Sequence, residues 1–278
     1  MTERPAGSDL DPTLENPRAE RVKKVAALAG RSARSRSGLF LVEGPQGVRE
    51  AVLHAAARVR DVYITPDAAA RYPEIVTSAR EAELFLHLGT PDVLHAMSPD
   101  CQGVLAVVDT SGTALEDAIS GTPRLIAVLA DVRDPGNAGT VIRAADAAGA
   151  DAVVLAGESV DLTNPKVVRS TAGSLFHLPV ARGGSLADTV EALRAAGLTI
   201  VATDGTATDE LGDPAVDELL AGPTAWVFGN EAHGLSPEDV ALADLAVRIP
   251  IYGAAESLNL ATAAAVCLYA SARVQRQN

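Results

Sequence analysis

The sequence predicts an α/β protein with two layered domains, the second of which carries a largely parallel sheet. Short apolar runs alternate with amphipathic stretches along the chain, and the pattern restarts in a more apolar form after a polar stretch at 110–122. A length of 278 residues suits two such domains. We expect a disordered tail at 1–16, a first domain at 17–109, a linker with a short helix at 110–122 and a second domain at 123–278.

Amphipathic helices that alternate with short strands predict the first domain. Val22, Val25 and Leu28 recur at helical spacing, which predicts a helix over 17–29 before a basic polar loop at 31–37. The remaining elements are strands and helices in alternation. We expect strands at 39–42, 61–65, 84–86 and 104–108, and helices at 48–57, 74–83 and 90–97.

The second domain begins with a continuous apolar run at 125–130, which is typical of a parallel strand buried on both faces. Hydrophobic residues make up 47% of the chain but aromatic residues only 3%, so we expect cores built mainly from Ala, Val and Leu. Further strands are expected at 152–155, 199–202, 226–228 and 245–251, and helices at 139–148, 187–196 and about 257–274.

Composition argues against a membrane or secreted protein. No apolar run approaches the roughly 18 residues that a transmembrane helix needs, and the polar N-terminus lacks the apolar region of a secretory signal. Cys101 and Cys267 lie far apart, in no metal-binding or redox spacing, and are expected to be buried free thiols. We therefore expect a cytoplasmic protein with no membrane partner.

The net charge of −13 argues against tight binding of nucleic acid by the molecule as a whole. The charge is unevenly distributed, however. Residues 1–109 hold 13 basic and 15 acidic side chains, a net of −2, whereas residues 110–278 hold 10 and 21, a net of −11. Between Arg18 and Arg36, seven basic residues and one acidic residue give +6. This segment is either a local RNA contact or a solvated helix and loop.

Ligands in open α/β sheets sit beyond the carboxyl ends of strands, and three such ends here are rich in polar residues and glycine. The first is DVRDPGNAGTVIR after strand 125–130, in which Asn137 is a predicted N-cap and Arg143 reaches the same loop. Neither the G-x-G-x-x-G of dinucleotide binding nor a Walker loop is present. Alone, the stretch is more often an ordinary capped turn followed by a surface arginine.

The second strand end, GNEAHGLS, places Glu231 and His233 on a loop after Gly229, whose missing side chain permits close backbone approach to a ligand. Ser236 and Pro237 then start a short helix. No third metal ligand lies at useful spacing, so we expect no metal here.

The third strand end is IPIYGAAESLN, before the last helix. Free backbone N–H groups at a helix start hold anions or polar ligands. Ser257 is therefore either a plain N-cap or part of a binding loop.

In this order and spacing, the three strand ends closely resemble the motifs of the SpoU/TrmH family of SPOUT methyltransferases. The matching segments are LADVRDPGNAGTVIRAADAAGA (129–150), WVFGNEAHGLSPE (226–238) and IPIYGAAESLNLATAAAVCLY (249–269), joined by NPKVVRSTAGSLFHLPV (164–180). The resemblance covers about residues 124–272. GLFLVEGPQGVREAV (38–52) also resembles the small ribosomal-protein-like substrate-binding domain that often precedes this domain.

The resemblance implies methyl transfer from S-adenosylmethionine to a ribose 2′-hydroxyl in RNA, by a domain with a deep trefoil knot and no metal. Because a guanidinium normally stays protonated, we favour a positioning and charge-stabilising role for the catalytic arginine over the general-base role proposed for the family. The implied cofactor contacts are Thr203, Gly229, Ile249 and Leu258. The implied catalytic group comprises Arg143, Asn137, Glu231, Ser257 and Asn259.

The family also implies a homodimer, in which Arg143 acts on the partner's cofactor and the Ala-rich last helix lies at the interface. We expect large-subunit (23S) ribosomal RNA as substrate. The candidate RNA contacts are Arg31, Arg34, Arg36, Glu43, Lys166 and Arg169. The alternatives are a tRNA methyltransferase and a non-catalytic RNA-binding or ribosome-assembly factor with the same fold. The absence of the glycine motif disfavours a dehydrogenase-like nucleotide binder.

Overall fold

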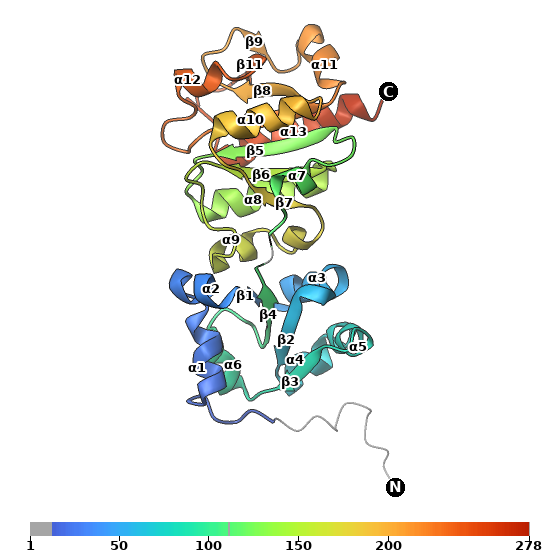
Figure 1. Cartoon of the computed structure of the whole chain (residues 1–278), viewed down its shortest axis with the longest axis vertical. Helices are drawn as coiled ribbons and strands as arrows, with labels where there is room; N and C mark the ends of the chain where they lie inside the picture. The colour runs from blue at the N-terminus through green and yellow to red at the C-terminus, as the bar shows by residue number, and fades with distance from the viewer. Residues whose placement is uncertain (1–12, 111, 278) are drawn as a thin grey trace. The chain divides into compact units, whose positions relative to one another are not determined.

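The computed structural model describes residues 13–110 and 112–277, and both of its parts are α/β layers, as the sequence predicts (Figure 1). Most of the predicted tail at 1–16 lies outside the described residues. Two compact units are present. One comprises the described residues up to Thr110 together with Leu162–His177, and the other comprises Gly112–Asp161 and the described residues from Leu178 onward.

The first unit holds a mixed four-stranded sheet in the order β1-β4-β2-β3. Strand β4 pairs antiparallel with β1 and β2, and β2 pairs parallel with β3. Both faces are covered, because successive residues of β1 enter different cores: Phe40 and Val42 join one apolar cluster and Leu41 joins another. The strands are β1 (Leu39–Glu43), β2 (Val59–Ile64), β3 (Phe85–Leu88) and β4 (Val104–Asp109).

One helix of the first unit corrects a sequence-based expectation. The basic stretch predicted as a loop at 31–37 is α2 (Arg31–Ser37), which ends at Gly38 in the left-handed conformation that favours glycine. Helix α4 was also not predicted. The helices are α1 (Glu20–Ala27), α2, α3 (Pro45–His54), the short η1 (Ala56–Arg58), α4 (Pro66–Arg71), α5 (Pro73–Glu81) and α6 (Pro91–Met97).

The second unit holds a seven-stranded sheet in the order β7-β6-β5-β10-β8-β11-β9, with every neighbouring pair parallel. Strands β5, β6 and β10 are buried along their whole length, as the continuous apolar runs predict. The strands are β5 (Leu125–Ala130), β6 (Ala152–Ala156), β7 (Val180–Arg182), β8 (Thr199–Thr203), β9 (Asp209–Glu210), β10 (Thr224–Phe228) and β11 (Leu245–Arg248).

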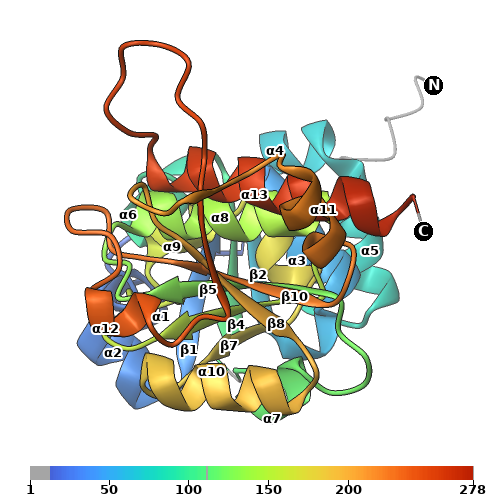
Figure 2. The same ribbon diagram turned by 90° about the horizontal axis from the view of Figure 1, so that it is seen from above.

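Helices cover both faces of this sheet (Figure 2). Helices α8 and α13 pack together on one face, and α10 and α7 lie on the other. Among the described residues, no helix is long and apolar enough to cross a membrane. The helices are α7 (Leu115–Ala118), within the predicted linker, α8 (Pro135–Ala148), α10 (Leu186–Ala195), α11 (Pro214–Leu220), α12 (Pro237–Val240) and α13 (Leu260–Gln275).

Two helix starts differ from those predicted. The N-cap of α8 is Asp134 in place of Asn137, because Pro135 occupies the first turn and the Asp134 carboxylate accepts from the Asn137 N–H at 2.8 Å. The N-cap of α13 is Asn259 in place of Ser257, because its side chain accepts from the N–H groups of the next turn. Ser236 caps α12, as predicted, in a full capping box.

The segment Leu162–His177 is the clearest difference from the predicted domain limits. It lies in the chain between β6 and β7 of the second unit but packs with the first. It contains α9 (Pro165–Ser170) and the short η2 (Ser174–Phe176), neither of which was predicted. Val168 and Phe176 enter the same apolar cluster as Phe40, so burial of these two side chains holds the segment there.

Helix α13 is tied to the sheet by a buried polar contact. The indole Nε1–H of Trp226 in β10 donates to Ser271 Oγ at 2.8 Å, and both side chains are fully buried. Cys267 on the same helix is a buried free thiol, as predicted for both cysteines, and burial raises its pKa.

Ser271→Ala should lower the free energy of unfolding by about 1–3 kcal/mol, because it leaves the buried indole N–H without an acceptor. Denaturant titration of variant and parent measures the change. Ser120→Ala is the matched control, since Ser120 Oγ also donates one hydrogen bond, to Asp117 O, but on an exposed surface. Equal stability of the two variants would contradict the role assigned to the Trp226–Ser271 contact.

Candidate functional site

The carboxyl ends of β8, β10 and β11 surround a cavity of about 490 Å³ in the second unit. Because parallel neighbours point the same way, the loops that follow them must emerge at one edge of the sheet. All four residues predicted to contact a cofactor line this cavity: Thr203, Gly229, Ile249 and Leu258. Glu231 and Ser257, predicted as catalytic, line it too.

The loop after β10 forms one wall of the cavity and folds back on itself. A Cβ at Gly229 would lie 2.3 Å from the carbonyl carbon of Gly234, so only glycine fits there. The sequence predicted that Gly229 permits close approach of the backbone to a ligand. In the structure, Gly229 permits close approach of the loop to its own backbone at Gly234. Asn230, which sequence analysis did not single out, donates from Nδ2 to Asp131 O at 2.8 Å and joins this loop to the one after β5.

A chain of hydrogen bonds connects three of the predicted catalytic residues. Asn259 Nδ2 donates to Asn137 Oδ1 at 3.0 Å, and Asn137 Nδ2 donates to Glu231 Oε1 at 3.3 Å. The Glu231 carboxylate also accepts from two backbone N–H groups, those of Arg133 at 3.3 Å and Asp134 at 3.1 Å. Side chains from the start of α8, the loop after β10 and the start of α13 are thus held together beside the cavity.

The segment before α13 leaves apolar side chains in solvent. It has no regular structure from Pro250 to Asn259, and its chain projects beyond α13 (Figure 2). Tyr252 is 92% exposed and Ile251 38% exposed. On α13 itself, Val266 and Tyr269 are 40% and 53% exposed. Exposed apolar side chains are therefore present both at the cavity, which Ile251 lines, and on α13.

Arg143 is not among the residues that line the cavity. It lies on α8 and is exposed, six residues beyond Asn137, which corresponds to about 9 Å along a helix axis. It makes no hydrogen bond or ion pair with any residue that the structure describes. One chain therefore brings Asn137, Glu231 and Asn259 together but does not add Arg143 to them.

The predicted RNA-contacting arginines of the first unit divide into two kinds. Arg31 and Arg36 are exposed on α2. Arg34 is only 4% exposed, and its guanidinium donates to Thr163 Oγ1 at 3.0 Å and to Ala29 O at 2.8 Å. Its side chain is used to hold the fold, so the predicted RNA contact by Arg34 is corrected to a structural role.

Arg36 borders a cavity of about 580 Å³ between α1, α2 and the sheet. Arg21 and Lys24 add two more cations to its lining, and neither was singled out from the sequence. The apolar part of the lining includes Tyr63, whose pKa burial raises to about 12, so its hydroxyl stays protonated. Three cations and one carboxylate, that of Asp61, therefore surround this apolar hollow.

Glu43 and Arg169, both predicted to contact RNA, contact each other. Arg169 Nη1 forms an ion pair with the Glu43 carboxylate and a second one with Asp100 at 3.1 Å. The Glu43 side chain is 5% exposed and also accepts a hydrogen bond from Ser98 Oγ. Lys166 lies in the first turn of α9, on the same segment as Arg169.

Comparison with known proteins bears on both units. The SpoU rRNA Methylase family matches residues 124–269, and the MRM3-like substrate binding domain matches residues 19–99. The 23S rRNA (uridine(2479)-2'-O)-methyltransferase of Streptomyces viridochromogenes is 37% identical, covering 89% of this chain and 87% of that protein. The 23S rRNA (guanosine(2553)-2'-O)-methyltransferase RlmP of Bacillus subtilis is 33% identical, covering 92% and 97%.

Solved structures give the same result. The SpoU methyltransferase AviRb from Streptomyces viridochromogenes, in complex with the cofactor AdoMet, has a TM-score of 0.79 and 35% identity, covering 94% of this chain and 100% of that one. The AdoMet-bound rRNA methyltransferase from Sinorhizobium meliloti has a TM-score of 0.78 and 28% identity, covering 94% and 97%. The similarity thus includes both units.

Arg169→Ala should lower the free energy of unfolding by about 1–3 kcal/mol, because it strands the nearly buried Glu43 carboxylate; the partial exposure of Arg169 reduces the effect. Adding Glu43→Gln should recover at least half of the loss, since the amide carries no charge. Denaturant titration measures both. Arg60→Ala, which breaks the exposed pair with Asp109, is the control with little expected change. Unchanged stability of Arg169→Ala would contradict a structural role for the ion pair. The guanidinium would then be available to bind an RNA phosphate.

Proposed function

The chain belongs to the SpoU rRNA methylase family, and on that premise we propose that it methylates one ribose 2′-hydroxyl of 23S rRNA with S-adenosylmethionine as donor. The observation that carries the proposal is the cavity at the strand ends, beside which Asn137, Glu231 and Asn259 form one hydrogen-bonded chain. The two relatives named above act on a uridine and a guanosine, so the family name leaves the base open.

The cavity fits the methyl donor in size and chemistry. Its volume of about 490 Å³ lies in the range of small-molecule sites, roughly 300–1,000 Å³. Ile249 and Leu258 supply apolar walls, and the backbone of the glycine loop after β10 supplies polar groups. When bound, S-adenosylmethionine supplies an electrophilic methyl group. The residues of the cavity bind and orient it, which accounts for the scarcity of charged side chains among the predicted contacts.

The hydrogen-bonded chain of Asn259, Asn137 and Glu231 orients the ribose hydroxyl, which is the nucleophile in this proposal. The Glu231 carboxylate is fixed by two backbone N–H groups, and it orients the Asn137 amide, which in turn accepts from Asn259. Such fixed polar groups hold a ribose hydroxyl in line with the methyl carbon at no further cost in side-chain ordering. Ser257, on the cavity wall, offers a hydroxyl to the same region.

Arg143 completes the site in a homodimer in this proposal. Its guanidinium has no intrachain partner among the described residues and lies outside the cavity lining of its own chain. The exposed apolar side chains before and along α13 are the surface that a second copy would cover. The partner's arginine would then stabilise charge on the hydroxyl oxygen as its proton leaves, and bind the adjacent phosphate.

RNA binding is proposed for the first unit and for the α9 segment. Arg31, Arg36, Arg21 and Lys24 are exposed cations on or between α1 and α2, where the segment of charge +6 lies. Single-stranded or looped RNA, whose bases splay outward, matches the hollow that three of these residues border. We place the protein in the cytoplasm with its ribosomal substrate, and we infer no metal requirement for methyl transfer.

Gly229→Ala should weaken S-adenosylmethionine binding at least about tenfold, because the added methyl group forces the loop away from Gly234 and reshapes the cavity wall. Isothermal titration calorimetry measures the affinity. Gly205→Ala is the control, since Gly205 lines the same cavity but a Cβ there would have nothing within 4 Å. Equal affinities for the two variants would place the donor elsewhere.

Methyl transfer from labelled S-adenosylmethionine to 23S rRNA should yield a labelled 2′-O-methyl nucleoside, and Arg143→Ala should lower the rate by a factor of about 10² or more. Mixing this variant with Gly229→Ala tests the dimer. Heterodimers with Arg143→Ala on one chain and Gly229→Ala on the other retain one intact site only if Arg143 acts on the partner's cavity. In an equal mixture about half of the dimers are heterodimers, and each of these has one intact site of two. Recovery of about a quarter of the parental activity is therefore expected, and no recovery would place Arg143 in its own chain's site.

Transfer RNA is the comparison substrate in the same assay. Label appearing in tRNA and absent from 23S rRNA would overturn the substrate assignment. Donor binding with no transfer to either RNA, or to ribosomal particles, would favour the non-catalytic RNA-binding factor.

A further inference from the structure

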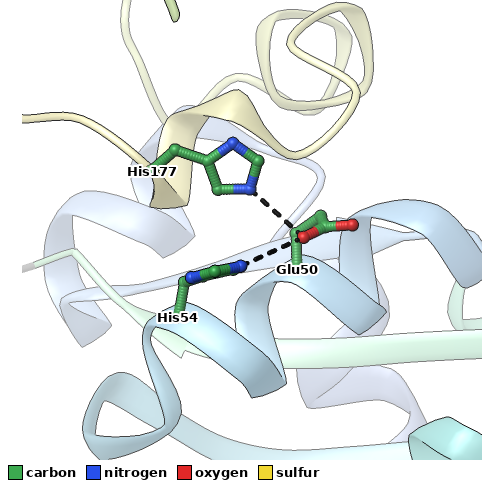
Figure 3. Close-up of side chains that lie close together, drawn as sticks. All are labelled: Glu50, His54 and His177. Atoms are coloured by element: carbon green, nitrogen blue, oxygen red, sulfur yellow. Dashed lines mark hydrogen bonds and ion pairs between the residues drawn. The ribbon is translucent and has the colours of Figure 1, made fainter.

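Three side chains with metal-binding atoms meet in the first unit, and none of them lines either of the two cavities described above (Figure 3). Glu50 and His54 lie on α3, and His177 directly follows η2. His177 Nε2 lies 3.1 Å from Glu50 Oε2, and His54 Nε2 lies 3.4 Å from the same oxygen. Figure 3 shows both rings turned toward this one carboxylate. No other group of three such side chains occurs within residues 13–110 and 112–277.

The local sequence explains why these groups converge. Glu50 and His54 are four residues apart, so they lie one above the other on a helix. Their helix buries Val48, Ala51 and Val52, which leaves Glu50 and His54 outside the core. Phe176 is buried in that same core, so it fixes the position of the next residue, His177.

Glycine allows the closest approach. Gly173 has a φ of +102°, and a Cβ there would lie 2.3 Å from Glu50 Cγ. The stem of Glu50 is therefore packed directly against the backbone of the Leu162–His177 segment. This packing aims the carboxylate at His177 and limits its freedom to turn elsewhere, which lowers the entropic cost of binding a ligand.

The distances match those of a tetrahedral zinc site. With Zn²⁺ about 2.0–2.2 Å from nitrogen and oxygen ligands, neighbouring ligand atoms lie about 3.4 Å apart. The two histidine-to-carboxylate distances are 3.4 and 3.1 Å, and all three ligand atoms lie within 4.8 Å of one another. Two imidazoles and one carboxylate form a donor set that zinc prefers, and the half-exposed His54 leaves room for a water as fourth ligand.

We propose that Glu50, His54 and His177 bind one Zn²⁺ ion, which fastens the Leu162–His177 segment to α3. The sequence alone did not indicate this site, because His177 lies more than a hundred positions after His54. Lys166 and Arg169 lie on α9 of this segment, so the ion would also fix the position of that helix. The role is structural, and the proposal does not depend on methyl transfer.

The test is calorimetric titration of the full-length, chelator-treated protein with Zn²⁺, with Mg²⁺ as the ion that a histidine-rich site should not bind. We expect one equivalent of Zn²⁺ to bind and to raise the melting temperature, because the ion binds only the folded chain. Loss of an outer-sphere partner alone costs metal sites about 10–100-fold in affinity, so His54→Ala, His177→Ala and Glu50→Gln should each cost at least about tenfold. His95→Ala, an exposed histidine on α6, should bind as the parent does.

Visible absorption of the Co²⁺-substituted protein gives a readout that does not depend on stability. Intense bands typical of tetrahedral Co²⁺ should appear in the parent and in His95→Ala and should be lost in His54→Ala, whose side chain is half exposed and dispensable to the core. Absence of Zn²⁺ binding in the parent, or equal affinity in His54→Ala and His95→Ala, would overturn the proposal. The three side chains would then form only a hydrogen-bonded clasp.

Discussion

The parallel pairing of β5, β10, β8 and β11 is the constraint on which the second unit depends. Parallel neighbours end at the same edge, so the loops after these strands must meet there, although they are spread over more than a hundred residues of sequence. Helices cover both faces of this sheet, so its central strands β5 and β10 are apolar and buried along their whole length. The cavity is a consequence of the sheet, and its walls combine glycines and aliphatic side chains with polar side chains from the loops.

Polar contacts between the loops turn this shared edge into a defined site. Asn230 joins the loop after β10 to the loop after β5, and the chain Asn259–Asn137–Glu231 adds the start of α13. Further along α13, the buried Trp226–Ser271 bond fixes the helix to β10. Membership of the family implies a knot in this domain. The hydrogen bonds named above join the loops of the same region. Rigid placement of small polar groups is what transfer to a weakly nucleophilic hydroxyl demands.

Much of this architecture could be predicted because apolar periodicity reports burial directly. The buried strands β5, β6 and β10 and the helix α10 followed from such runs. The four predicted cofactor contacts came from the resemblance to a family, and the structure shows of them that they line one cavity. Features decided by tertiary contacts could not be predicted. Arg34 was predicted to contact RNA, because its burial and its hydrogen bond to Thr163 depend on the folded chain. The α2 stretch carried no helical apolar stripe at all. Segment Leu162–His177 was assigned by its position in the chain, whereas Val168 and Phe176 determine where it packs.

The central claim is that the strand-end cavity holds the methyl donor, and a crystal structure of the protein with S-adenosylmethionine tests it most directly. We expect the bound donor against Thr203, Gly229, Ile249 and Leu258, with its methyl group facing the Asn137–Glu231–Asn259 chain. A donor bound in the cavity between α1 and α2, or one whose methyl group faces away from this chain, would contradict the account.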